Sequence, residues 1–164
     1  MPHLLRSTSP RIVFVSATFH YTGMPLQAHV SAAKAAIDSL MASVALEYGP
    51  RGVQSNCISP GAVADTEGMA RLGSSQADAI REFERGVPSG RMATVRDVAD
   101  ATVFLLSEAG AYINGQVVPV DGGSWRRTAA LPVGLDEAHK YPDFLLSGEI
   151  SRHLKDPRKS KAKL

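Results

Sequence analysis

One lysine stands where a ligand-binding cation would be expected. Lys34 lies in the first turn of a helix predicted over residues 31–48, directly after a polar loop at 17–28. The loop follows a short predicted strand, so in a parallel sheet the lysine would reach the carboxyl edge of the strands, where α/β proteins bind ligands. An ammonium at this edge can hold a cofactor or substrate oxygen. The alternative is an ordinary solvated lysine on a helix surface.

The loop after the next predicted strand is the second candidate. Its backbone N–H groups could meet a ligand at the same edge, although a plain turn is also typical of a Pro-Gly pair. The residues concerned are Pro60, Gly61, Ala62, Val63 and Thr66. Just beyond them lies Arg71, whose guanidinium has a fork geometry that suits a phosphate. The other interpretation of Arg71 is a surface arginine.

The remaining polar residues form no recognisable catalytic motif. The histidines are scattered, with no i, i+4 pair on a helix, so we expect no metal site. Tyr21 could donate a proton but stands alone in its loop, and Ser16 and Ser31 have no adjacent base. No G-x-G-x-x-G or G-x-x-x-x-G-K-[ST] motif lies between a strand and a helix. The sequence therefore does not encode a pyrophosphate cradle.

Length and composition exclude several classes of protein. The chain has 164 residues, of which 44% are apolar and 21% charged, as in one ordinary globular domain. Cys57 is the single cysteine, so no intrachain disulfide can form, and no apolar run approaches the ~20 residues that a membrane helix needs. Residues 1–10 contain no apolar core of a secretory signal. We expect a soluble protein of a reducing compartment.

The net charge of +2 conceals an uneven distribution. Residues 151–164 hold six basic side chains and one acidic one, which leaves 12 of the 18 basic and 15 of the 16 acidic side chains for the rest of the chain. A slightly acidic body with a basic tail is not typical of a nucleic-acid domain, whose positive charge lies on a folded face. We therefore expect no nucleic-acid partner.

Strands and helices alternate along the chain. The predicted strands are 11–16, 53–58 and 115–120, and the predicted helices are 31–48, 75–86 and 95–107. Thr94 and Asp97 have the spacing of a capping box at the start of the last helix. This order predicts an α/β protein with a parallel, doubly wound, Rossmann-like sheet. Three strands are few for that fold, so we expect only its second half, without the amino-terminal strands and the glycine-rich loop.

The expected organisation has three parts. Residues 1–10 form an irregular leader, 11–127 the half-domain, and 128–164 an extended tail that is basic and disordered at its end. The chain ends in Ala162, Lys163 and Leu164, a conservative variant of the S-K-L peroxisomal address.

Taken together, residues 11–123 resemble the carboxyl-terminal half of a short-chain dehydrogenase/reductase. The matching pieces are RIVFVSAT, SAAKAAIDSLMASVALEYGPRGVQSNCISPG, the GR…DVA…FLL stretch at 90–106, and YINGQVVPVDGG at 112–123. The common pattern of this family has a serine after the first strand and a tyrosine four residues before the lysine. Here these positions are Ala17 and Val30, so only Lys34 of that triad remains.

One branch of the family lacks the same hydroxyls: the peroxisomal 2,4-dienoyl-CoA reductases. This chain is similar to that branch at SATFHYTGMPLQAHVSAAK (16–34), at SPGAVADTEGMARLG (59–73) and in its AKL ending. The resemblance implies NADPH-dependent reduction of a 2,4-dienoyl-CoA to a 3-enoyl-CoA in peroxisomal β-oxidation of unsaturated fatty acids. It also implies a place in the peroxisomal matrix, reached through an import receptor that binds residues 162–164; a cytoplasmic location is the alternative.

The resemblance further implies roles for the candidate residues. Lys34 would contact the nicotinamide ribose and act in catalysis, the backbone of Pro60, Gly61, Ala62 and Val63 would hold the carboxamide, and Thr66 would lie near the cofactor phosphates. Arg71 would bind the CoA part of the acyl-CoA substrate. We expect a homo-oligomer, or pairing with a missing amino-terminal half, and weak or no NADPH binding by this chain alone. The alternatives are a non-catalytic fragment and a short-chain reductase with another substrate.

Overall fold

A three-stranded parallel sheet forms the centre of the protein. The computed structural model describes residues 1–24, 27–72 and 77–126. Strand β1 (Arg11–Val15) pairs with β2 (Gln54–Pro60), and β2 pairs with β3 (Val117–Val120), in the order β1-β2-β3. This is the α/β, Rossmann-like sheet that the alternation of elements predicts. The expected tail at 128–164, with its C-terminal tripeptide, lies outside the described residues.

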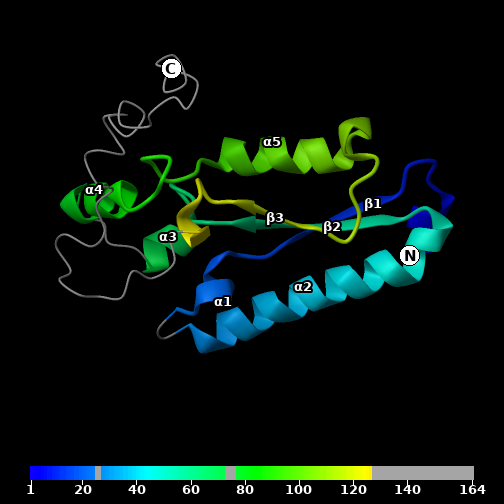
Figure 1. Cartoon of the computed structure of the whole chain (residues 1–164), viewed down its shortest axis with the longest axis horizontal. Coiled ribbons are helices and arrows are strands. Elements are labelled where there is room, and N and C mark those ends of the chain that lie inside the picture. Colours follow the sequence, from blue (N-terminus) through cyan, green and yellow to red (C-terminus); the bar gives the residue numbers. More distant parts are fainter. Residues whose placement is uncertain (25–26, 73–76, 127–164) are drawn as a thin grey trace, which may run out of the picture. The chain divides into compact units, whose positions relative to one another are not determined.

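Two long helices cover opposite faces of the sheet (Figure 1). Helix α2 (Ala28–Tyr48) packs on β1 and β2, and α5 (Val95–Leu106) packs on all three strands. Along β2, Cys57 and Ile58 are both fully buried, and because successive side chains point to opposite faces, β2 contributes to both layers. Met41 of α2 and Leu105 of α5 are the matching core residues of the two helices. No helix in the described ranges is long and apolar enough to cross a membrane.

Several local expectations are confirmed. Helix α5 begins with the capping box: Thr94 Oγ1 accepts the Asp97 N–H and the Asp97 carboxylate accepts the Thr94 N–H. Helix α4 (Ala77–Arg85) lies within the predicted 75–86 segment. Helix α2 ends at Tyr48, directly before Gly49-Pro50. The left-handed residue that follows is Gly52, at φ +83°, because Gly49–Arg51 first add a 3₁₀ turn.

Other boundaries differ from the sequence expectation. Helix α2 begins at Ala28, not at 31, so it extends into the predicted loop at 17–28. The same loop contains a short helix, α1 (Phe19–Thr22), and the loop after β2 contains another, α3 (Glu67–Leu72). Within the predicted irregular leader, Leu4–Arg6 form a 3₁₀ turn. These pieces are too short for hydrophobic periodicity to reveal.

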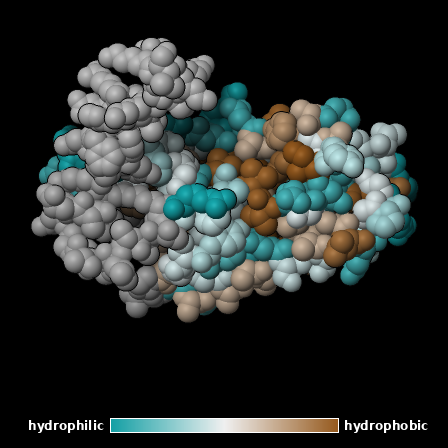
Figure 2. Space-filling view, in the orientation of Figure 1, coloured by the Kyte–Doolittle hydropathy of each residue, from teal (hydrophilic) through white to brown (hydrophobic). Residues whose placement is uncertain are grey.

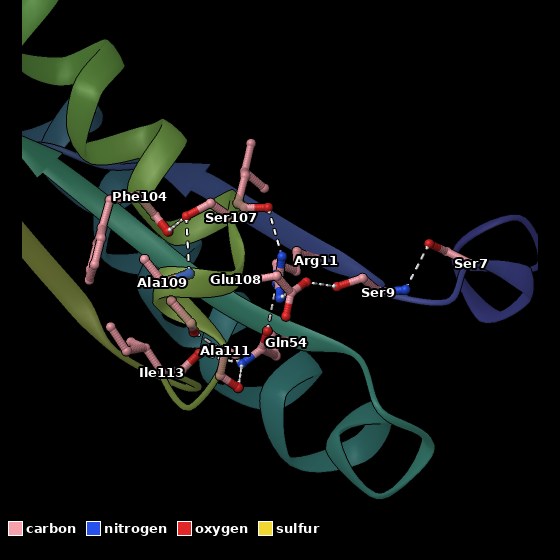
Figure 3. A network of polar contacts seen from close by, with 12 residues as sticks. Ser7, Ser9, Arg11, Gln54, Phe104, Ser107, Glu108, Ala109, Ala111 and Ile113 are labelled. Atoms are coloured by element: carbon pink, nitrogen blue, oxygen red, sulfur yellow. Dashed lines mark hydrogen bonds and ion pairs between the residues drawn. The ribbon is translucent and has the colours of Figure 1, made fainter.

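A buried arginine ties the amino end of the sheet to the end of α5 (Figure 3). Arg11 donates to Gln54 Oε1 at 2.8 Å, to Leu106 O at 2.8 Å and to Glu108 Oε1 at 2.9 Å. Its side chain is only 8% exposed, whereas that of Glu108 is 80% exposed. Ser9 Oγ donates to the same Glu108 oxygen at 3.1 Å. Arg11 thus joins β1, β2 and the connection between α5 and β3.

Replacing Arg11 should destabilise the protein measurably. Arg11→Met keeps most of the apolar stem but leaves the acceptors on Gln54 and Leu106 without their arginine donor, which costs about 1 kcal/mol. Urea unfolding followed by circular dichroism measures this loss. The control is Arg96→Met, which removes an 83%-exposed arginine from an i, i+4 pair with Asp100 and should change stability little. Equal effects of the two substitutions would contradict the role of Arg11.

Candidate active site at the carboxyl edge of the sheet

The segments that leave the three strands are held together at the carboxyl edge. The Thr18 N–H donates to Pro60 O at 3.0 Å, and the Gly61 N–H donates to Val120 O at 3.0 Å. A Cβ atom added to Gly61 would lie 2.7 Å from Asp121 Cβ, so only glycine fits this approach. The predicted Pro-Gly loop therefore lies between the segments that follow β1 and β3.

Lys34 is fixed at this edge without losing its charge. Its Nζ donates to Val15 O, the last carbonyl of β1, at 3.0 Å, and it forms no ion pair within the residues that the structure describes. The predicted position of Lys34 at the carboxyl edge is confirmed. Its predicted position in the first turn of the helix is wrong, since α2 begins at Ala28 and Lys34 lies in the second turn. An ammonium has three donors, so two remain for a ligand.

The Pro-Gly loop is held by backbone hydrogen bonds but keeps free donors. Ala62 O accepts the Ala93 N–H at 3.0 Å, and the Ala64 N–H donates to Ala93 O at 2.8 Å. The amides of Ala62 and Val63 have no acceptor among the described residues. This arrangement leaves two adjacent N–H groups beside the end of β2 for a ligand.

Thr66 and Arg71 have local partners. Thr66 Oγ1 donates to Val63 O at 2.9 Å and accepts the Met69 N–H at 3.3 Å, so it caps α3. Arg71 pairs with Glu67 one turn earlier on α3, and both side chains are more than 70% exposed. No described hydrogen bond or ion pair joins either residue to Lys34. The structure thus brings together Lys34 and the Pro-Gly loop at one edge but leaves Arg71 on the surface.

A carboxylate that the sequence analysis missed organises the site. Asp38 lies one turn after Lys34 on α2, and its Oδ2 accepts hydrogen bonds from His20 Nε2 at 2.8 Å and from the Tyr21 hydroxyl at 2.9 Å. Cys57 Sγ lies 3.5 Å from Oδ1. The i, i+4 spacing from Lys34 was the available signal, because it places Asp38 on the same helix face. The His20 side chain is buried in this cluster, since it is 8% exposed.

In the cluster formed by Asp38, His20, Tyr21 and Cys57, the negative charge lies on Asp38, while Tyr21 and Cys57 stay neutral. Burial by itself raises the pKa of Asp38, but hydrogen bonds outweigh burial and lower the pKa below its usual value. The donors are Ser16, Tyr21, Cys57 and His20. Burial, together with the charge of Asp38, raises the pKa of Tyr21 to about 12 and that of Cys57 to about 12. Tyr21 is therefore a hydrogen-bond donor at neutral pH, and Cys57 is not a nucleophile.

The site has one cation, free backbone donors and no metal cluster. Among the described residues, no group of three His, Cys, Asp or Glu side chains could hold a metal ion. Ala17 and Val30 supply no hydroxyl beside Lys34. Fixed donors of this kind can bind a polar ligand and stabilise negative charge that develops on it. A parallel α/β sheet with such a site at its carboxyl edge belongs to the nucleotide-binding class of folds.

Comparison with known proteins narrows this class. Residues 1–124 match the family model described as enoyl-(acyl carrier protein) reductase. The peroxisomal 2,4-dienoyl-CoA reductase of Saccharomyces cerevisiae is 42% identical over 149 residues, which are 90% of this chain and 48% of that protein. The enzyme of the same description from Danio rerio is 42% identical over 72% of this chain and 39% of its own length. The chain thus spans about half the length of the curated relatives it matches.

The solved structures that resemble this chain are also oxidoreductases. A gluconate 5-dehydrogenase from Burkholderia cenocepacia, in complex with NADP and tartrate, has a TM-score of 0.68 and 27% identity over 75% of this chain and 48% of that one. An oxidoreductase of the short-chain dehydrogenase/reductase family from Burkholderia thailandensis has a TM-score of 0.61 and 34% identity, covering 70% and 43%. The chain belongs to the short-chain dehydrogenase/reductase family of oxidoreductases.

The Asp38 cluster should make the fold sensitive to acid. A carboxylate whose pKa is lowered by folding stabilises the protein above its unfolded pKa, and this contribution is lost as the pH falls through the folded pKa. Asp38→Asn should therefore flatten the loss of stability as the pH falls below the usual aspartate pKa of about 4. Thermal unfolding as a function of pH measures the difference.

The matched control is Asp78→Asn, which changes an exposed aspartate on α4. Its acid profile should follow that of the unchanged chain. An unaltered profile for Asp38→Asn would contradict the role of the Asp38 charge in this loss of stability.

Proposed function

We propose that this chain supplies the nicotinamide side of the active site of an NADPH-dependent 2,4-dienoyl-CoA reductase, which converts a 2,4-dienoyl-CoA to a 3-enoyl-CoA. The observation that carries the proposal is the fixed, uncompensated ammonium of Lys34, 3.0 Å from the last carbonyl of β1. The similarity to peroxisomal 2,4-dienoyl-CoA reductases selects the substrate class.

The free donors at the sheet edge fit one end of the cofactor. When bound, NADPH would supply the hydride. Lys34 would hold the nicotinamide ribose, and the free amides of Ala62 and Val63, after Pro60 and Gly61, would hold the carboxamide. Thr66 would lie near the phosphates, although its hydroxyl proton already points to Val63 O.

The substrate requires a site that stabilises negative charge. Reduction of a conjugated dienoyl thioester at its far end places charge on the thioester oxygen, and a fixed cation lowers the energy of that charged state. The positive charge of Lys34 meets this need electrostatically, because Ala17 and Val30 offer no hydroxyl that could donate a hydrogen bond. Arg71 would bind the CoA part, for which its guanidinium would have to leave Glu67.

The exposed surfaces of the chain indicate a partner. Strand β1 pairs on one side only within the described residues, and Val15 is 52% exposed. On the outer face of α2, Leu40 and Leu46 are 53% and 80% exposed, and Figure 2 shows apolar residues over α5 and β3. Such surfaces favour association. We propose that a strand-bearing amino-terminal piece, or a second copy of the chain, covers them.

Two other functions remain as alternatives. A non-catalytic piece would carry the same fold but hold no cofactor, because the described residues include no glycine-rich cradle. A reductase with another substrate is favoured by the likeness to a gluconate 5-dehydrogenase.

A complementation assay tests the proposal. This chain alone should bind NADPH too weakly to saturate in calorimetry. Mixed with the part of the Saccharomyces cerevisiae relative outside the matched region, it should co-elute and oxidise NADPH only when hexa-2,4-dienoyl-CoA is added. Lys34→Met should lower that rate by about 100-fold or more, since it removes the fixed charge.

The control for this assay is Arg81→Met, on exposed α4, which should leave the rate unchanged. Saturable, Lys34-dependent NADPH binding by the chain alone would contradict the proposal that this chain supplies only the nicotinamide side of the cofactor site. Co-elution without turnover would favour the non-catalytic piece, and oxidation of gluconate with NADP would favour the other substrate.

We also propose a location in the peroxisomal matrix. Ala162, Lys163 and Leu164 would bind the import receptor, and the relatives named above are peroxisomal enzymes. A fluorescent protein fused ahead of this chain should enter peroxisomes, and deletion of residues 162–164 should leave it in the cytoplasm. Moving the three residues away from the terminus by an added glycine is the matched control and should block import as well. Unchanged import after the deletion would contradict the proposal.

A further inference from the structure

The segments that follow the two outer strands meet across the central strand. Helix α1 follows β1, and a 3₁₀ turn at Ser124–Arg126 follows β3; these two pieces are in contact. Their contact is aromatic: the rings of Tyr21 and Trp125 have centroids 5.7 Å apart and are tilted by 51°. Because β2 lies between β1 and β3, this pair spans the carboxyl end of β2, where the Pro-Gly loop begins.

Each residue of the pair is anchored on its own side of the site, Tyr21 by its hydroxyl and Trp125 by its backbone. The Tyr21 hydroxyl donates to Asp38 at 2.9 Å, and the His20 ring lies 4.0 Å from the Tyr21 ring. On the other side, the Trp125 backbone N–H donates to Asp121 Oδ2 at 2.8 Å. Asp121 is 8% exposed and also accepts from Gly123 and Ser124. The half-buried Asp38 thus holds the Tyr21 side chain, and the buried Asp121 holds the backbone that carries Trp125.

The pair presents apolar surface with a cation beside it. Tyr21 remains 39% exposed although its hydroxyl is engaged, so the accessible part is largely its ring. The Arg126 guanidinium lies over one face of the Trp125 ring, 4.2 Å from its centre, and Arg126 is exposed. The exposed part of the Tyr21 ring, next to this cation, suits a ligand with an apolar part and an anionic part. A fatty acyl thioester of CoA has both.

We propose that Tyr21 and Trp125 form the binding surface for the acyl group of the thioester, with Arg126 facing its anionic CoA part. The inference rests on the proposed function and adds the residues that recognise the substrate chain. Asp38 and Asp121 are then positioning residues, because they hold the Tyr21 hydroxyl and the Trp125 backbone and do not touch the ligand. The acyl group lies at the carboxyl end of β2, beside the loop proposed to hold the nicotinamide.

The single tryptophan of the chain makes this testable directly. Trp125 emission is followed while the 164-residue chain is titrated with hexa-2,4-dienoyl-CoA, and calorimetry records binding in parallel. CoA without an acyl group is the matched ligand. We expect saturable quenching by the thioester and much weaker binding of CoA. Tyr21→Ala should weaken thioester binding by about five-fold, and Tyr21→Phe, which keeps the ring, should retain most of it.

The control variant is Tyr112→Ala, which removes an entirely exposed tyrosine near the opposite end of the sheet and should change nothing. If Tyr21→Ala leaves the affinity for the thioester unchanged, or if thioester binding leaves Trp125 emission unchanged, the two rings do not bind the acyl group. The proposed function stands in either case. Equal binding of CoA and the thioester overturns it too. If neither ligand binds and the complementation assay is also silent, the proposed function fails and this inference fails with it.

Discussion

Parallel pairing of β2 with both of its neighbours is the constraint on which the site depends. In this register, Val15, Pro60 and Val120 end their strands at one edge. The segments that follow are then linked by the hydrogen bonds from Thr18 to Pro60 and from Gly61 to Val120. Gly61 has no room for a side chain because Asp121 approaches so closely. A shift in register would separate the Pro-Gly loop from the lysine and from the aromatic pair.

The features that the sequence predicts correctly are those with a strong local cause. The strands, their parallel pairing and the Thr94–Asp97 cap follow from apolar patterning and backbone chemistry. Lys34 is placed at the correct edge of the sheet, although one helical turn too early, because its helix follows a strand. Helix α1 and the Asp38 cluster are missed because their cause is tertiary. His20 and Tyr21 look like loop residues until α2 brings a carboxylate 18 and 17 positions away into hydrogen-bond distance.

Asp38 also explains why Tyr21 cannot replace the tyrosine that this chain lacks. Its hydroxyl already donates to the charged carboxylate, and burial with that charge raises the pKa of Tyr21 to about 12. A phenol in this state holds its proton firmly and is tied to α2 rather than to a reacting atom. The cluster is better suited to positioning than to proton transfer. A proton donor for the proposed reaction must therefore come from solvent or from a residue outside this cluster.

Lys34 shows how a charged side chain can be fixed in a site without an oppositely charged partner. A carboxylate partner would fix the ammonium equally well but would offset its charge, whereas the Val15 carbonyl is neutral and leaves the charge available. Asp38 lies only one turn away, yet its oxygens are already occupied by His20, Tyr21 and Cys57, so it does not capture the lysine. Because these other donors satisfy the Asp38 carboxylate, the positive charge of Lys34 stays free to act at the sheet edge.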